Sequence, residues 1–302
     1  MEPTYQGIVP PMITPLTGRD SLDVAGLERL VDRLIEGGVS GIFVLGTTGE
    51  APSLSYRLRR ELVEKTCQLV NGRIPVLVGI TDTSIVESVA LAQASAGYGA
   101  DAVVTSAPFY FPAGQPELRE YIEQLVPELP LPLMLYNMPS LTKVSFSRMV
   151  VEWAMDCEKV IGLKDSSGDL TYFRKMQHLA AERRPDWSLL VGPEEILAET
   201  VLLGGHGGVN GGANLYPSLY VNLYKAAKAG DLEKTRELSR RVLELSESIY
   251  HVGQHGSAII KGLKCALSIL GICDDFMAAP FHRFREAERE QIAQHLKELG
   301  IG

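Results

Sequence analysis

Two short apolar runs, LPLMLYN at 131–137 and VIGLKDS at 160–166, decide the fold of this chain. Both are rich in β-forming residues and neither alternates with polar positions, which is typical of parallel strands covered on both faces. A helical stretch separates them, for which Ser145 is the expected N-cap, and Asp169 is the expected cap of the next helix. The segment therefore predicts a strand–helix–strand unit with parallel strands.

The same unit recurs along the chain. Six further runs resemble these two: GIVPPMIT (7–14), VSGIFVLG (39–46), PVLVGI (75–80), DAVVTS (101–106), WSLLVG (187–192) and GGVNGG (207–212). The last is the weakest, because glycine lowers strand propensity. Apolar residues at helical spacing lie between the runs, such as those at 27–35, where Gly37 and Gly38 can end the helix. Eight β units in this order predict an α/β fold, a closed (β/α)8 TIM barrel rather than an open sheet.

The chain changes character after about Tyr216. Strand-like runs stop, and helical stretches follow near 217–228, 231–251, 256–271 and 283–299. Because α/β barrels take about 250 residues, the 302 residues fit one barrel with an appendage. We expect a catalytic barrel over residues 1–225 and a C-terminal helical domain over residues 226–302.

Composition narrows the possible partners and the compartment. The chain has 29 Lys and Arg against 37 Asp and Glu, a net charge of −8, which disfavours binding to nucleic acid. No apolar run reaches the roughly 18 residues of a membrane helix, and the residues after Met1 lack the pattern of a signal peptide. The four cysteines lie far apart and form no CxxC pair, so we expect reduced thiols in a cytoplasmic protein.

Lys164 is the sharpest functional candidate, because it follows four apolar or glycine residues inside a strand pattern. Catalytic groups of such barrels lie where strands end and loops begin. Burial lowers the pKa of a lysine and exposes a neutral amine, which can attack a ketone and form a Schiff base. The alternative is a structural lysine paired with Asp165 or Asp169.

Two other strand ends carry candidate side chains. Tyr136 ends the fifth run and can relay protons at the mouth of the barrel, or it can be a buried tyrosine with a satisfied hydroxyl. The second run ends in GTTGE at 46–50, where Thr47, Thr48 and free N–H groups can hold a carboxylate. The alternative for this motif is a tight loop with Thr48 as a helix cap.

Three further patterns have plainer explanations. The aromatic residues at 109–111 favour packing at a rim or an interface. His251 and His255 have the spacing of a metal pair, but no third ligand is evident. The glycine-rich stretch at 204–212 can cradle a phosphate or allow close approach to a small acid.

Taken in order, GTTGE (46–50), YNMP (136–139), GLKDSSGD (162–169) and GGHGG (204–208) resemble one family over nearly the whole chain. It is the dihydrodipicolinate synthase / N-acetylneuraminate lyase family of class I aldolases. The resemblance implies a barrel with a C-terminal helical domain, usually a tetramer of two tight dimers. It also implies no cofactor and no metal.

The resemblance implies catalytic roles for four residues. Lys164 would form an imine with pyruvate or another 2-oxo acid, and Tyr136 would relay protons beside it. Thr47 would link Tyr136 to a second tyrosine. Tyr110 matches that second tyrosine, which typically reaches into the active site of a neighbouring subunit, although the loop FYFPAGQ departs from the usual form.

The resemblance also implies contacts to the substrate. Thr48, with the backbone N–H of Thr47, resembles the carboxylate clamp. Val209 stands where the family places a backbone carbonyl close to the imine, and Gly192 is a further candidate contact.

Leu141 helps to distinguish between the activities found within the family. Dihydrodipicolinate synthases carry an arginine at this position, which holds the carboxylate of aspartate semialdehyde, and leucine makes no such contact. Lys143 is a possible substitute. Leucine before threonine resembles the aldolases of 2-keto-3-deoxygluconate, whose aldehyde partners, such as glyceraldehyde, are uncharged.

We therefore expect reversible aldol cleavage of a 2-keto-3-deoxy sugar acid to pyruvate and a hydroxyaldehyde. Alternatives are 4-hydroxy-tetrahydrodipicolinate synthase, a dehydratase of keto-deoxy sugar acids, and N-acetylneuraminate lyase, which typically has serine in place of Thr48. Two alternatives need no aldolase chemistry: a barrel that senses a 2-oxo acid, and a barrel that binds a phosphate sugar.

Overall fold

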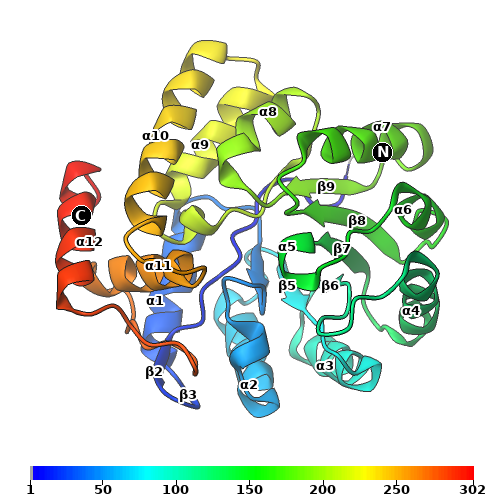
Figure 1. Cartoon of the computed structure of the whole chain (residues 1–302), viewed down its shortest axis with the longest axis horizontal. Coiled ribbons are helices and arrows are strands. Elements are labelled where there is room, and N and C mark those ends of the chain that lie inside the picture. Colours follow the sequence, from blue (N-terminus) through cyan, green and yellow to red (C-terminus); the bar gives the residue numbers. More distant parts are fainter. Residues whose placement is uncertain (1–2) are drawn as a thin grey trace.

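A computed structural model describes residues 3–302 and forms a closed barrel of eight parallel strands (Figure 1). The strands are β1 (Gly7–Ile8), β4 (Ile42–Val44), β5 (Val76–Gly79), β6 (Ala102–Ser106), β7 (Leu133–Asn137), β8 (Val160–Asp165), β9 (Ser188–Val191) and β10 (Gly207–Gly208). They pair in chain order, and β10 pairs with β1. The ring closes at Phe43, whose N–H donates to the carbonyl of Pro10 at 2.9 Å and whose carbonyl accepts the N–H of Met12 at 2.8 Å. The expected (β/α)8 barrel is confirmed.

Helices cover the outside of the barrel. They are α1 (Val24–Glu36), α2 (Tyr56–Val70), α3 (Ile85–Tyr98), α4 (Gln115–Glu128), α6 (Arg148–Ala154), α7 (Leu170–Arg183), α8 (Leu197–Leu202) and α9 (Pro217–Lys228). The loops at one end contain a short helix and three turns of 3₁₀ helix: α5 (Pro139–Thr142), η1 (Ala51–Ser53), η2 (Glu194–Ile196) and η3 (Gly211–Asn214). A hairpin that the sequence did not predict, β2 (Leu16–Gly18) with β3 (Ser21–Leu22), precedes α1.

Side chains explain where two of these helices begin. The expected cap Asp169 accepts N–H groups from Thr171 at 2.8 Å and Tyr172 at 3.1 Å. The expected cap Ser145 is wrong, because Ser147 accepts the N–H of Val150 and α6 starts two residues later than predicted.

Side chains along each strand point alternately into the barrel and out toward the helices, which gives an inner and an outer hydrophobic core. Leu133 and Leu135 of β7 pack against the helices, whereas Met134 and Tyr136 belong to a cluster inside the barrel. Tyr136 is in register with Lys164 on β8. The period of two therefore sends both functional side chains to the interior, at the ends of neighbouring strands.

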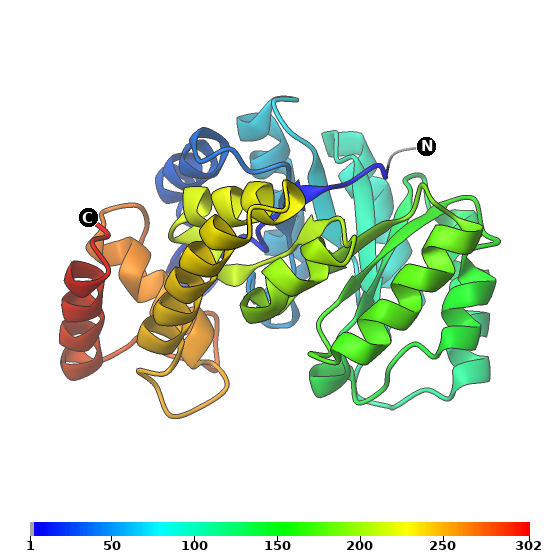
Figure 2. The ribbon, with the colours of Figure 1, turned by 90° about the horizontal axis from the view of Figure 1, so that it is seen from above.

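Three helices follow the barrel: α10 (Leu232–Tyr250), α11 (Ala258–Ile269) and α12 (Glu286–Glu298). With α9 they match the four predicted helical stretches, and α11 and α12 lie to one side of the barrel (Figure 2). The predicted division at residue 225 would fall in the last turn of α9, and it stays a prediction. No helix within residues 3–302 is long and apolar enough to cross a membrane.

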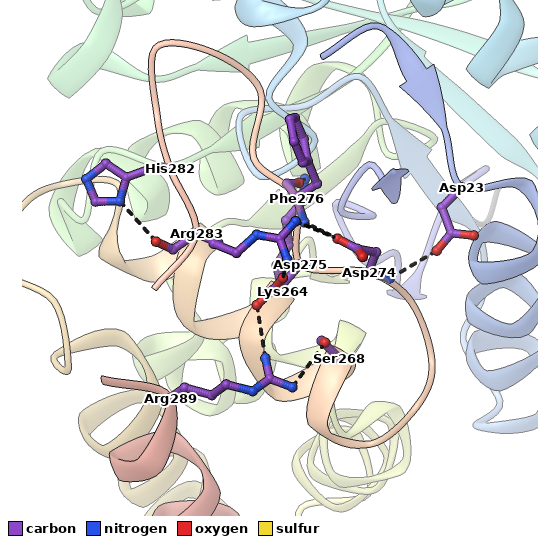
Figure 3. Close-up of polar contacts among 9 residues, drawn as sticks. All are labelled: Asp23, Lys264, Ser268, Asp274, Asp275, Phe276, His282, Arg283 and Arg289. Carbon is purple, nitrogen blue, oxygen red and sulfur yellow. Dashed lines mark hydrogen bonds and ion pairs between the residues drawn. The ribbon is translucent and has the colours of Figure 1, made fainter. Parts of the chain in front are cut away.

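Polar contacts fix the segment between α11 and α12 (Figure 3). Asp23, which caps α1, accepts the backbone N–H of Asp274 at 3.0 Å. Asp275 forms ion pairs with Arg283 and Arg289, each at 3.0 Å, and Arg283 also pairs with Asp274 at 3.2 Å. These contacts hold residues 274–283 against both the barrel and α12.

Candidate active site

Lys164 lies inside the barrel at the end of β8 and is only 3% exposed. Its Nζ is 3.9 Å from the centroid of the Tyr136 ring and 5.0 Å from that of Phe43. Burial lowers the pKa of Lys164, and Tyr136 opposes this only in part. The site therefore favours the neutral amine, which is the nucleophilic form.

The structure does not contain the alternative, an ion pair of Lys164 with Asp165 or Asp169. Within residues 3–302 no carboxylate lies within ion-pair distance of Lys164. Asp165 instead accepts hydrogen bonds from the side chains of Asn137 at 2.8 Å and Ser167 at 2.9 Å, and Asp169 caps α7. Both predicted partners are thus engaged elsewhere.

The hydroxyl groups of Tyr136 and Thr47 lie 3.2 Å apart, within hydrogen-bond distance. Tyr136 is 7% exposed, and Thr47 lies in the loop between β4 and α2. Phe43 meets the Tyr136 ring edge-on, with centroids 6.4 Å apart, and restricts how the ring can turn. The pair is therefore ordered beside the amine of Lys164.

Two cavities open at this end of the barrel and share Thr47, Tyr136 and Met138. The lysine cavity, of about 310 Å³, is lined by Pro11, Thr47, Thr48, Tyr136, Met138, Lys164, Ser166, Gly192, Pro193, Glu194, Glu195, Val209, Gly211, Tyr250, Gly256, Ile259 and Ile260. The apolar cavity, of about 250 Å³, is lined by Phe43, Leu45, Gly46, Thr47, Ala51, Pro52, Gly79, Thr81, Ser106, Phe109, Tyr136, Met138, Leu141 and Thr142. The lysine cavity thus brings together Lys164, Tyr136, Thr47, Thr48, Gly192 and Val209, six of the eight predicted site residues.

Gly192 is where the wall of the lysine cavity requires a glycine. A Cβ atom at this position would lie 1.9 Å from Oγ of Ser166. The absence of a side chain lets the loops after β8 and β9 approach each other, and it leaves room beside Lys164.

Leu141 and Tyr110, the other two predicted residues, lie outside the lysine cavity. Leu141 lines the apolar cavity and is 54% exposed. Tyr110 lines neither cavity; it is 84% exposed, has a φ of 83° and meets Phe111 edge-on at 5.0 Å. The fold of a single chain does not bring Tyr110 to Lys164, so its role across an interface stays a prediction.

Lys143, the possible substitute for a carboxylate-binding arginine, points elsewhere. Its Nζ donates to the backbone carbonyl of Ser140 at 2.6 Å, and it lines neither cavity. The glycine-rich stretch also has a structural role: a Cβ at Gly207 would lie 1.9 Å from the carbonyl of Gly7, the residue with which it pairs. Within residues 3–302 no group of three or more His, Cys, Asp or Glu is placed to hold a metal ion.

Glu194 is a buried acid in the wall of the lysine cavity that the sequence analysis missed. One carboxylate oxygen accepts the hydroxyls of Tyr220 at 2.5 Å and Tyr250 at 2.9 Å, and the other accepts the N–H of Gly212 at 2.9 Å. Burial raises its pKa to about 7, although these donors oppose the rise. The acidic pair at 194–195 after a predicted strand was the only signal for it.

Glu50, the last residue of GTTGE, is buried and connects the motif to the C-terminal helices. It forms an ion pair with Lys264 of α11 and accepts the N–H of Ala278 at 2.8 Å. Its left-handed φ of 57° turns the chain sharply after Thr48. Glu50 thus helps to fix the loop that presents both threonines.

Known proteins resemble the chain over its whole length. The model of the dihydrodipicolinate synthetase family matches residues 4–299. A probable 2-dehydro-3-deoxy-D-pentonate aldolase, YjhH of Escherichia coli, is 35% identical and covers 98% of each chain. The structure of a dihydrodipicolinate synthase from Bacteroides thetaiotaomicron is 56% identical with a TM-score of 0.95, covering 99% of this chain and 100% of the other.

A third relative has been solved with a small molecule. YagE of E. coli, in complex with pyruvate, is 30% identical with a TM-score of 0.93, covering 99% of this chain and 100% of the other. Its fold and that of the present barrel agree from end to end. Matches of this extent establish ancestry as well as architecture, and the chain belongs to the dihydrodipicolinate synthetase family.

Proposed function

We propose that the chain is a Schiff-base-forming lyase that reversibly cleaves a 2-keto-3-deoxy sugar acid to pyruvate and a hydroxyaldehyde. The observation that carries the proposal is Lys164, a buried lysine without an ion pair in the described chain, in a cavity beside a tyrosine. Such an amine is poised to attack a ketone. The named aldolases among the relatives, and the pyruvate held by YagE, support the same chemistry.

The first step joins the substrate to the enzyme. The neutral amine of Lys164 attacks the C2 ketone, and Tyr136 donates a proton to the hydroxyl that leaves the carbinolamine as water. An iminium ion remains between Lys164 and C2, and Tyr136 is left as a phenolate whose hydrogen bond from Thr47 stabilises it.

The second step breaks the carbon–carbon bond. Tyr136 takes the proton of the C4 hydroxyl, the C3–C4 bond breaks, and its electron pair flows into the iminium ion to give an enamine. The aldehyde leaves, Tyr136 returns the proton to C3, and water hydrolyses the imine to release pyruvate and Lys164. Positioned acid–base help of this kind contributes roughly 10²–10⁴-fold.

The substrate's carboxylate belongs at Thr48 and the backbone N–H of Thr47 in this proposal. Both residues line the lysine cavity with Lys164. The carbonyl of Val209 would face the imine, and Gly192 leaves space for the bound acid. Hydrogen bonds to a carboxylate are stronger than those between neutral groups, so two donors suffice to orient it.

The charges around the two cavities favour an uncharged aldehyde. Among the described residues no charged side chain lines the apolar cavity, and Lys164 is the one basic side chain of the lysine cavity. Leu141 offers no donor, and Glu195 in the wall would repel a second carboxylate. A polyhydroxy aldehyde, whose hydroxyls can donate to Glu195, fits this lining better than aspartate semialdehyde does.

A second candidate is 4-hydroxy-tetrahydrodipicolinate synthase. The similarity to the dihydrodipicolinate synthase of Bacteroides thetaiotaomicron, which is 56% identical to this chain, favours this candidate. Both candidates begin with the same imine, and they differ in the aldehyde that the enamine meets. We also propose, from the family resemblance, a cytoplasmic homotetramer with residues 1–225 as its catalytic part.

The test traps the imine and then varies the aldehyde. The protein is incubated with pyruvate and borohydride, and the reduced adduct is located by peptide mass spectrometry. We expect it on Lys164 in the wild type and in Lys143→Ala, the matched exposed lysine nearby, and not in Lys164→Ala. No adduct on folded wild type would refute the proposed chemistry.

Wild-type protein that was not treated with borohydride is then assayed for pyruvate release from 2-keto-3-deoxy-pentonate and 2-keto-3-deoxy-gluconate, and for condensation of pyruvate with aspartate semialdehyde. We expect release from at least one sugar acid and a far lower rate with the semialdehyde. The reverse order would favour the synthase.

A further inference from the structure

A separate cavity of about 360 Å³ lies among the C-terminal helices. We call it the C-terminal cavity; its walls are the segment 252–258, the first turns of α11 and the residues that lead into α12. The segment after α10 borders two cavities, because Tyr250 and Gly256 line the lysine cavity while Val252, His255 and Ser257 line this one.

Lys261, in the first turn of α11, is the unusual residue of the C-terminal cavity. It is only 8% exposed, and no hydrogen bond or ion pair of its ammonium group occurs within residues 3–302. Lys264, three residues further along the helix, shows the ordinary solution: it is ion-paired with Glu50 and donates to the carbonyl of Phe276 at 2.7 Å. The stem of Lys261 is buried, but its ammonium group still reaches the open space of the cavity, so it is accessible to a ligand there.

Apart from Lys261, the fixed charges that line the C-terminal cavity are one cation, Arg285, and one carboxylate, Glu288. Arg285 has no ion pair in the described part of the chain. Glu288 is the single carboxylate that residues 3–302 contribute to the lining, and one of its oxygens accepts the backbone N–H of Arg285 at 3.1 Å. Two fixed cations therefore face one acid that is already hydrogen-bonded.

The wall that carries Arg285 is held in place independently of any ligand. Arg283 pairs with Asp274 and Asp275, and the side chain of His282 turns back to the carbonyl of Arg283 at 3.0 Å (Figure 3). The cavity is thus bounded by a fixed wall, by the first turn of α11, which carries Lys261, and by the segment that it shares with the lysine cavity.

We propose that the C-terminal cavity binds a small oxyanion, a phosphate or carboxylate group, through Lys261 and Arg285. The anion would supply a counter-charge to Lys261 and to Arg285, which line the same cavity and have no ion pair within residues 3–302. Charge-assisted hydrogen bonds of this kind are among the stronger polar contacts in proteins. The proposal concerns binding alone and does not depend on the proposed lyase activity.

The test is calorimetric titration of the folded protein with inorganic phosphate and, separately, with acetate, at constant pH and ionic strength. The two anions distinguish a phosphate site from a carboxylate site. We expect saturable binding of one anion per chain. Lys261→Met should weaken it at least tenfold, and Lys175→Met, which removes an exposed lysine of α7, should leave it unchanged.

Two further variants keep the proposal open to refutation. Arg285→Gln changes an exposed side chain, so it should fold normally, and it should weaken binding severalfold. Lys164→Ala should bind the anion as the wild type does; loss of binding there would assign the anion to the lysine cavity instead. Two results would overturn the proposal. One is that neither anion binds the wild type saturably; the other is that Lys261→Met and Arg285→Gln both bind with wild-type affinity.

Discussion

Replacing Lys264 by methionine tests whether the C-terminal helices hold the GTTGE loop in place. The side chains of Lys264 and Glu50 are 0% and 1% exposed, and methionine keeps most of the volume of lysine while removing its charge. After the change, Glu50 stays buried, and the N–H of Ala278 is the one donor left to it within residues 3–302; the carbonyl of Phe276 loses the donor Lys264.

The expected loss is large. Removing one partner of a buried ion pair costs about 3–5 kcal/mol, because a charge is left uncompensated away from water. The entropy of unfolding is about 2.1 cal/mol/K per residue, which for a chain of 302 residues gives about 0.6 kcal/mol/K. The melting temperature of Lys264→Met should therefore fall by about 5–8 °C.

A double variant separates the ion pair from other effects. Glu50→Gln with Lys264→Met removes both charges, so no uncompensated charge remains, and it should be more stable than Lys264→Met alone. The free energies of unfolding are measured by urea denaturation followed by circular dichroism. A loss below about 1 kcal/mol in Lys264→Met, or a double variant that loses the sum of both single changes, would refute this reasoning.

Three further predictions concern the site. Tyr136→Phe keeps the ring beside Lys164 but removes the hydroxyl, so kcat should fall roughly 10²–10⁴-fold with little change in KM, measured by steady-state kinetics. Tyr110→Phe should lower turnover if this exposed tyrosine completes a neighbouring site, and an unchanged rate would refute that role. Burial raises the pKa of Glu194 to about 7, so the folded protein holds a proton that the unfolded chain releases from about pH 4.5 upward. Its contribution to stability is full at low pH and is lost as the pH rises through about 7, by up to about 3 kcal/mol; urea denaturation at pH 5 and pH 8 should show a larger loss in wild type than in Glu194→Gln.

Local patterns were enough to predict most of the fold. The runs at 131–137 and 160–166 became β7 and β8, and the four helical stretches of the C-terminal part match α9 to α12 within about three residues. The β2–β3 hairpin was missed because its strands have three and two residues, too few for a period to show. Ser145 was wrong as a cap because tertiary contacts extend the preceding loop: the carbonyl of Ser145 accepts from Gln115.

The residues of the candidate site also fall into those that the sequence predicts and those that it does not. Strand ends were predictable, so Lys164, Tyr136 and Thr48 were found and do line one cavity. The partners of the buried charges could not be predicted, because a local sequence pattern does not indicate which residues 26–228 positions away will be in contact after folding. Glu194 meets Tyr220 and Tyr250 only after folding, and Glu50 meets Ala278 in the same way.

The closure of the barrel has a consequence for how the chain is made. β1 pairs with β10, so Gly7 can pair with Gly207 only after Gly207 has been synthesised. The N–H of Ile13 likewise donates to the side chain of Asn214, 201 residues later in the chain. During synthesis at about 5–20 residues per second, the first strand emerges at least about ten seconds before its last partner. Throughout that interval one side of β1, a strand of only two residues, lacks its partner. The barrel therefore closes only after residues 207–214 have left the ribosome, so its closure follows synthesis of most of the chain.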